Sequence, residues 1–380
     1  MSVSLRWDPY FLARGEEVPA FWSDLARVRD RKVLYILGRG FDPRTTKGVE
    51  VLMSSEFDGS CDCLVVNMRG FDDGGPRPLV RLSNRNFDSL ASLISGRGTV
   101  SVAEVDAWSG DGDTRTRTGP DRALRLVSRE TLSSYTDVVL DVSALPRGLY
   151  FPLLARLVAL CSPGDDSQNL HIFVAEDPAL DSRIEESGLD EDAYFVPPFR
   201  SAMELESAAP VVWFPILGEK QNPQVEMVQT LVRQKAQSAD VEVCPVLPLP
   251  ARDPRRADCL IRQYSEFLAS SWENDSRNFV YVAEQNPFQA YRQLVHSARQ
   301  YNGALRSVGG CRVVISAHSS KLLSVGATLA AIELKAGGLK VGLANVDATS
   351  YQVSDPTNDP FQNTGVVPHL ISLAGDAYEV

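Results

Sequence analysis

Hydrophobic residues in the first half of the chain gather in short continuous runs, and these runs are separated by stretches with helical spacing. Such runs are typical of strands buried on both faces of a sheet. The clearest helical stretch is Leu149–Leu160. The alternation predicts a parallel sheet covered by helices. The expected strands are residues 33–37, 63–66, 100–105, 138–142 and 171–175.

The second half repeats this scheme. Helical spacing of three and four between apolar residues marks Pro223–Gln234, Arg255–Ser270, Pro287–Tyr301 and Leu322–Lys335. Apolar runs that predict strands alternate with these helices. The runs are residues 211–217, 241–247, 279–283, 313–316 and 339–344.

The two halves also share short sequence matches in the same order. Ile36-Leu37-Gly38 and Ile216-Leu217-Gly218 lie 180 positions apart, as do Val102-Ala103-Glu104 and Val282-Ala283-Glu284. Val142-Ser143-Ala144 and Ile315-Ser316-Ala317 lie 173 positions apart. The matches favour an internal duplication, and the alternative is convergence on similar strand ends. We therefore expect an α/β protein with two tandem Rossmann-like domains. Each would hold a mostly parallel five-stranded sheet with helices on both faces, in the strand order 2-1-3-4-5.

Breaks in this pattern suggest the domain limits. Pro197-Pro198 interrupts regular structure, and the boundary is expected near Phe199–Pro210. The expected division is a first domain over residues 1–200, a second over 205–350 and an irregular C-terminal tail over 351–380 wrapped on the second domain. The polar stretch 109–121 is expected to be a mobile or solvent-facing loop.

Composition narrows the functional classes. The chain has 380 residues and a net charge of −11, which argues against general nucleic-acid binding because phosphate contacts need a basic face. A local basic pocket for one small anion stays compatible with this charge. The N-terminus lacks a secretory pattern, and no apolar run approaches the roughly 20 residues that cross a bilayer. The expected location is therefore the cytoplasm, away from membranes.

The six cysteines are expected to be reduced thiols. Several lie in apolar runs, where cysteine is usually a small core residue. The one close pair, Cys61 and Cys63, has no second pair that would complete a zinc site. No metal is expected.

Ligands of open parallel sheets bind beyond the carboxyl ends of the strands, so four strand ends are candidate sites. The first carries Gly38, Arg39, Gly40, Asp42 and Arg44. Glycines allow a backbone to approach a ligand closely, and arginines bind phosphate or carboxylate. The alternative is an ordinary turn with a solvated arginine.

The second strand end carries Asp141, Ser143 and Arg147. A carboxylate within an apolar run is costly unless it is paired or hydrogen bonded. One interpretation is a helix capped by Ser143 with Arg147 paired to Asp141. The other has Ser143 and Arg147 holding an anionic group.

The third strand end gathers Ser316, His318, Ser319, Ser320 and Lys321 before an expected helix. Hydroxyls, an imidazole and an ammonium at a helix N-terminus suit an anion. Ordinary capping by Ser319 or Ser320 is the alternative. Lys321 is expected to face a cleft shared with the first domain, near Arg44 or Arg147.

The fourth strand end carries Glu284, Asn286 and Arg292. Asn286 is placed to cap the following helix. Glu284 is a candidate general base or a partner for Arg292. Glu284 and His318 are the candidate catalytic residues, but no Ser-His-Asp order, nucleophile elbow or metalloprotease motif accompanies them.

Two similar halves with converging strand ends resemble, in architecture alone, the CARF and SAVED sensors of bacterial antiviral systems. In those families fused Rossmann-like units bind cyclic oligonucleotides. The resemblance implies a nucleotide- or phosphate-binding sensory protein of bacterial defence. Two alternatives stay open, namely an enzyme acting on a nucleotide or phosphosugar between the domains, and a non-catalytic subunit of a larger complex. A nucleotide is the only cofactor suggested, with a small anionic ligand or a protein as partner.

Overall fold

The computed structural model describes residues 4–27, 30–70, 77–110, 114–161, 168–204, 207–237, 239–272, 278–353 and 365–378. The chain forms two compact units. Unit A comprises Pro9–Leu189 and Ala348–Val380, and unit B comprises Met1–Asp8 and Asp190–Asp347. This division differs from the expected blocks in three respects. Met1–Asp8 belongs to unit B, unit B resumes at Asp190 instead of residue 205, and the C-terminal residues belong to unit A.

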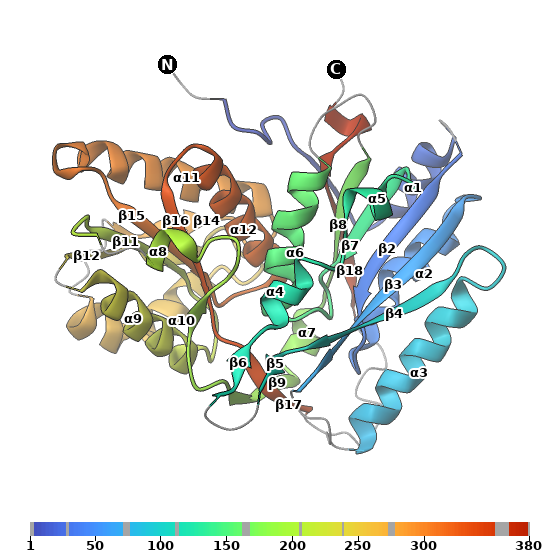
Figure 1. The fold of residues 1–380 in the computed structure, drawn as a ribbon, viewed down its shortest axis with the longest axis horizontal. Helices are drawn as coiled ribbons and strands as arrows, with labels where there is room; N and C mark the ends of the chain where they lie inside the picture. The colour runs from blue at the N-terminus through green and yellow to red at the C-terminus, as the bar shows by residue number, and fades with distance from the viewer. Residues whose placement is uncertain are drawn as a thin grey trace. The chain divides into compact units, whose positions relative to one another are not determined.

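The large sheet of unit A has seven strands (Figure 1). They are β1 (Phe11–Arg14), β2 (Lys32–Gly38), β3 (Ser60–Arg69), β4 (Val100–Asp106), β7 (Asp137–Asp141), β8 (Asn169–Glu176) and β18 (Val367–Ala374). They lie in the order β1-β18-β8-β7-β2-β3-β4. Each of the five expected strands is present, and these five are parallel. β18 and β1 extend the sheet as antiparallel neighbours.

Numbered along the chain, the five parallel strands of unit A lie in the order 3-2-1-4-5. The expected order 2-1-3-4-5 is wrong. Both orders use the same alternation of strands and helices, so the apolar pattern does not distinguish them. The order depends on the side of the first strand to which each crossover returns, which is a property of the folded chain.

Helices cover both faces of this sheet. The helices of unit A are α1 (Glu17–Ala26), α2 (Lys47–Ser54), α3 (Arg77–Leu93), α4 (Gly119–Ala123), α5 (Arg129–Leu132), α6 (Arg147–Leu160) and α7 (Pro178–Asp181). In Figure 1, α2 and α3 lie on one side of the sheet and α6 on the other. Every residue of β7 and β8 is buried, as continuous apolar strands between two helical layers should be.

Two smaller pairings lie outside the large sheet of unit A. β5 (Trp108–Ser109) and β6 (Thr116–Arg117) form an antiparallel pair within the stretch expected to be a loop, of which residues 111–113 lie outside the described part. β9 (Ile184–Leu189) pairs antiparallel with β17 (Ala348–Val353). The chain therefore leaves unit A along β9 and returns along β17.

The C-terminal residues are not an irregular tail, where the structure describes them. β17 includes residues 351–353, and β18 is a strand whose last six residues are buried. β18 inserts between β8 and β1 of unit A instead of wrapping on the second domain. Pro368, which has no N–H to donate, is the second residue of β18 and lies outside the stretch that pairs with β1. Residues 354–364, which include Pro356 and Pro360, lie outside the described residues.

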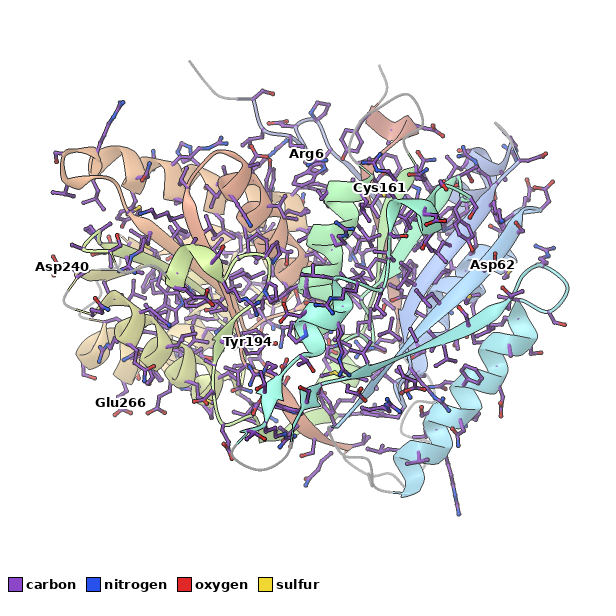
Figure 2. All side chains as sticks on the ribbon, in the orientation of Figure 1. Arg6, Asp62, Cys161, Tyr194, Asp240 and Glu266 are labelled. Atoms are coloured by element: carbon purple, nitrogen blue, oxygen red, sulfur yellow. The ribbon has the colours of Figure 1, made fainter. Side chains whose placement is uncertain are left out.

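Unit B also has a seven-stranded sheet. Its strands are β10 (Tyr194–Phe195), β11 (Val211–Ile216), β12 (Val241–Val243), β13 (Val246–Pro248), β14 (Val280–Val282), β15 (Arg312–Ala317) and β16 (Lys340–Asn345). The order is β10-β16-β15-β11-β13-β14, with β12 also paired to β11. β10 is antiparallel, and its Tyr194 (labelled in Figure 2) donates a 2.9 Å hydrogen bond to Asp347.

Unit B is likewise covered on both faces. Its helices are α8 (Ser201–Glu204), α9 (Asn222–Ala236), α10 (Arg256–Gln263), α11 (Pro287–Ala304) and α12 (Lys321–Ala336), with a π-helical turn at Phe267–Ser271. α11 and α12 lie together on one side of the sheet in Figure 1. Gly326 makes their close packing possible, since a Cβ there would lie 2.4 Å from the carbonyl oxygen of Pro287.

The parallel strands of unit B, numbered along the chain, also follow the order 3-2-1-4-5, so the two units share one topology. The expected count of five strands per sheet is wrong. Each sheet has seven, because antiparallel strands extend both and because the second strand of unit B is split into β12 and β13.

Strand register tests the sequence matches between the halves. Ile36 pairs with Leu140, and Ile216 pairs with Ala317. If Ile36 and Ile216 are equivalent, then Leu140 and Ala317 are equivalent, and these lie 177 positions apart. The tripeptides matched on that strand lie 173 positions apart and are therefore four residues out of register. The shared strand order remains, and the internal duplication stays a prediction.

All six cysteines are free, five of them buried and Cys259 exposed. Within the described parts of the chain, no helix is both long enough and apolar enough to span a membrane.

Candidate functional site

In each unit the strand order reverses next to the first strand. The reversal falls between β2 and β7 in unit A and between β11 and β15 in unit B. Crevices at such points are the usual ligand sites of open α/β sheets. Three of the four strand ends chosen from the sequence flank these two points, and the fourth follows β14.

The loop after β2 in unit A is held tightly by its neighbours. A Cβ on Gly38 would lie 3.1 Å from the carbonyl oxygen of Ala144, so the loop after β7 crosses directly over the end of β2. The side-chain amide of Asn86, on α3, donates to the carbonyl oxygens of Gly40 and Asp42 at 3.0 and 3.1 Å. These contacts fix the backbone conformation of the loop.

Arg44 is engaged within this loop instead of facing solvent. Its Nε and Nη2 donate to both carboxylate oxygens of Asp42, and its Nη1 donates to Asp181 at 2.7 Å. Burial opposes the charge on Arg44, but Asp42 and Asp181 outweigh it and hold its pKa above the usual value. The charge of Arg44 is therefore balanced, and its role is to tie the loop to α7.

The start of α2, at the end of this loop, has unused hydrogen-bonding capacity. Thr46 occupies the cap position but makes no capping bond, and its hydroxyl donates to Glu50 at 2.6 Å. The first-turn N–H groups of an α-helix have no partner within the helix. Thr45 is 4% exposed, and its hydroxyl has no hydrogen-bond partner. That hydroxyl lies 3.7 Å from where a Cβ on Gly40 would be.

Asp141 lies in the core beside this helix. It accepts hydrogen bonds from the Ser143 N–H at 2.9 Å and from the Tyr35 hydroxyl at 3.1 Å. Burial raises its pKa to about 7, against hydrogen bonds from Ser143 and Tyr35 that lower it. The Ser143 hydroxyl also accepts from the Ala175 N–H. Ser143 therefore does not cap α6, whose cap position is Pro146.

The remaining arginines of unit A have other partners. Arg147 lies 3.8 Å from Glu186, so the expected pair with Asp141 is not formed. Arg39 contacts Phe87, with its guanidinium 4.9 Å from the ring centroid, and donates to Asn84 at 3.0 Å. Arg39 lies in the loop after β2, and neither of these two contacts involves a carboxylate.

At the reversal point of unit B, the loops after the two neighbouring strands β11 and β15 approach each other more closely than the corresponding loops of unit A. A Cβ on Gly218 would lie 1.7 Å from the carbonyl oxygen of His318. Ser316 is fully buried and accepts from the Trp213 indole at 3.0 Å, and His318 Nε2 lies 3.0 Å from the same hydroxyl. Ser320 caps α12 by accepting from the Leu323 N–H. Capping therefore accounts for Ser320. Ser319 and Lys321 each have further contacts.

The side chains singled out at the fourth strand end have partners within unit B. Glu284 accepts from the Arg252 N–H at 2.8 Å and pairs with Arg256 at 3.0 Å, and it does not pair with Arg292. Arg292 pairs with Asp8 instead. Asn286 caps α11 by accepting from two backbone N–H groups, as expected. Whether any of these residues binds a ligand stays a prediction.

The structure thus gathers the first two chosen segments, around Gly38 and Asp141, at one edge of unit A. Sequence reasoning missed four residues there, namely Tyr35, Thr45, Gly48 and Asn86. The hydroxyls of Thr45 and Thr46 just before a helix were a usable signal. Asn86 and Gly48 carried none, because their roles arise from packing between elements distant in the sequence.

Among the described residues, no group of histidine, cysteine or carboxylate side chains is arranged to hold a metal ion. The edge of unit A instead offers backbone N–H groups and a hydroxyl. This donor set suits an oxyanion.

No protein-family model matches the chain, and no curated protein matches it. Among solved structures, a putative universal stress protein from Pseudomonas aeruginosa UCBPP-PA14 aligns at 10% identity and a TM-score of 0.24, covering 83% of this chain and 92% of that one. A universal stress protein from Archaeoglobus fulgidus DSM 4304 aligns at 9% identity and a TM-score of 0.23, covering 82% and 95%. At such TM-scores neither structure informs the function of this chain.

Proposed function

We propose that unit A is a sensory or regulatory module that binds a phosphate-bearing ligand of the nucleotide class between β2 and α2. The observation that carries the proposal is the start of α2. Its first turn lacks a side-chain cap, and the buried hydroxyl of Thr45 beside it lacks a partner. A phosphate oxygen would satisfy both, since helix N-termini bind anions through free N–H groups.

The position in the fold supports the same site. The loop contains Gly38 and Gly40 and follows the first strand, next to the reversal of strand order where nucleotides bind in doubly wound sheets. No observation favours the enzymatic alternative to the same degree, because its candidate residues Glu284 and His318 already have partners within unit B.

Thermal unfolding with added ATP, NAD⁺, inorganic pyrophosphate and a cyclic oligonucleotide tests the proposal. A ligand that binds only the native state raises the melting temperature by mass action. The cyclic oligonucleotide tests the CARF and SAVED resemblance, and turnover of a bound nucleotide would favour the enzymatic alternative. If none of the four compounds shifts the transition at millimolar concentration, the proposal is wrong.

Thr45→Val localises the site. Because the Thr45 hydroxyl has no partner, its removal should leave the stability of the free protein unchanged or slightly higher. Loss of one hydrogen bond to a phosphate should weaken binding about tenfold. Thr230→Val, at an exposed position of α9, is the matched control and should leave both quantities unchanged.

A further inference from the structure

The first turn of α2 rests directly on the buried pair Tyr35 and Asp141. A Cβ on Gly48 would lie 1.7 Å from the Tyr35 hydroxyl and 2.9 Å from Oδ2 of Asp141. Only glycine allows the helix to come this close. The proposed phosphate subsite and the Asp141 carboxyl are therefore adjacent, on the two sides of one helical turn.

Two ion pairs lie around this turn. Asp42 and Arg44 form a pair in the loop, and Lys47 and Glu50 form a pair on α2 at 3.4 Å. Asp181 of α7 is a second carboxylate on Arg44, so these five residues carry one net negative charge.

Asp141 adds a charge beside this turn that changes with pH. Its nearest groups on the strands are uncharged, namely the Tyr35 hydroxyl, the Ser143 backbone N–H and the ring of Phe173, which also borders Gly48. When Asp141 is protonated it adds no charge beside the helix N-terminus. When it is ionised it adds a further negative charge, which repels an anion more strongly.

We propose that binding of a phosphate-bearing ligand at the first turn of α2 is coupled to proton uptake by Asp141. This inference rests on the function proposed above and adds its regulation. Asp141 is half ionised at about pH 7, so the coupling acts near neutrality. An anion bound beside Asp141 raises the carboxyl pKa further, so affinity is highest at mildly acidic pH and falls as pH rises.

Calorimetric titration with ATP at about pH 6 and about pH 8 tests this coupling by linkage. Repeating the titration in buffers of different ionisation enthalpy counts the protons taken up on binding, and the difference between wild type and Asp141→Asn is the uptake by Asp141. The dissociation constant of wild type should rise about tenfold more between the two pH values than that of Asp141→Asn. Titration of ATP itself contributes equally to both proteins and cancels in this comparison.

Two further variants keep the test decisive. Asp88→Asn, at an exposed position on α3, should behave as wild type. Tyr35→Phe removes a hydrogen bond that lowers the Asp141 pKa, and should move the pH dependence to higher pH. Binding of ATP with the same pH dependence in wild type and Asp141→Asn would overturn the coupling and leave the proposed function standing. If neither ATP nor any of the other three compounds binds at either pH value, both the coupling and the proposed function are wrong.

Discussion

The Tyr35 hydroxyl donates a hydrogen bond to Oδ2 of Asp141 across 3.1 Å, in a part of the core where each residue is 1% exposed. The two residues stand on the adjacent parallel strands β2 and β7. Burial, together with the neighbouring Asp141, raises the Tyr35 pKa well above its ordinary value, so its proton stays in place to donate. Asp141 is the member of the pair that titrates near neutrality.

Asp141 should make the protein less stable as pH rises. Its folded pKa of about 7 lies above the value of about 3.9 expected in the unfolded chain. Its contribution to stability is therefore fully present below about pH 4 and is lost as pH rises through about 7. The shift corresponds to at most about 4 kcal/mol. Urea unfolding of wild type and Asp141→Asn should show the variant gaining relative stability between about pH 5 and pH 8. Parallel pH profiles would contradict this prediction.

Gly48→Ala should destabilise unit A by about 3 kcal/mol or more, because the new methyl group overlaps the Tyr35 hydroxyl. Denaturant unfolding measures the loss. The double variant Gly48→Ala with Tyr35→Phe should recover part of it. Gly303→Ala is the control, since nothing lies within 4 Å of its Cβ position on α11, and it should stabilise by up to about 1 kcal/mol. Equal losses in the single and double variants would show that the hydroxyl is not the obstacle.

Gly218→Ala should be much more harmful than Gly38→Ala. The Cβ at Gly218 would lie 1.7 Å from a backbone carbonyl oxygen, whereas the Cβ at Gly38 meets its nearest atoms at 3.1 Å. An overlap of this size at Gly218 requires the backbone itself to shift, whereas at Gly38 the neighbouring atoms need to move by only a few tenths of an ångström. We expect losses of more than about 3 kcal/mol at Gly218 and about 1 kcal/mol at Gly38, measured by thermal unfolding. The reverse ranking would mean that the loop after β15 yields easily.

Asp376→Ala should lower the stability of unit A by about 2–3 kcal/mol, because it removes a partner of a buried arginine. Arg31 has a side chain 1% exposed and donates to Asp376 at 3.0 Å, and its other partners are Asp137 at 3.5 Å and the carbonyl oxygen of Leu25 at 3.0 Å. Asp24→Ala is the control, since its pair with Arg27 is exposed and should contribute less than about 0.5 kcal/mol. Urea unfolding of both variants tests the difference. Equal effects would mean that Arg31 finds water when Asp376 is lost.

Local pattern was sufficient to locate the parallel strands. All ten expected strands occur, one of them split into β12 and β13, because short continuous apolar runs are typical of strands buried on both faces of a covered sheet. The capping role open to Asn286 follows from a short-range interaction with the next turn, and the structure shows it. The pattern was not sufficient to predict the C-terminal strand β18, whose apolar run follows a proline-containing segment and carries Pro368 within it.

The amino-acid sequence by itself therefore determined the alternation of strands and helices, because that alternation depends on side chains a few positions apart. Only the tertiary structure decided the strand order, the return of β18 to unit A and the partners of the candidate site. Arg44 shows the reason. Asp42, two positions away, pairs with it, and the fold also brings Asp181 from 137 positions away to within 2.7 Å as a second carboxylate. Contacts between distant segments leave Thr45, not Arg44, as the group with unused hydrogen-bonding capacity.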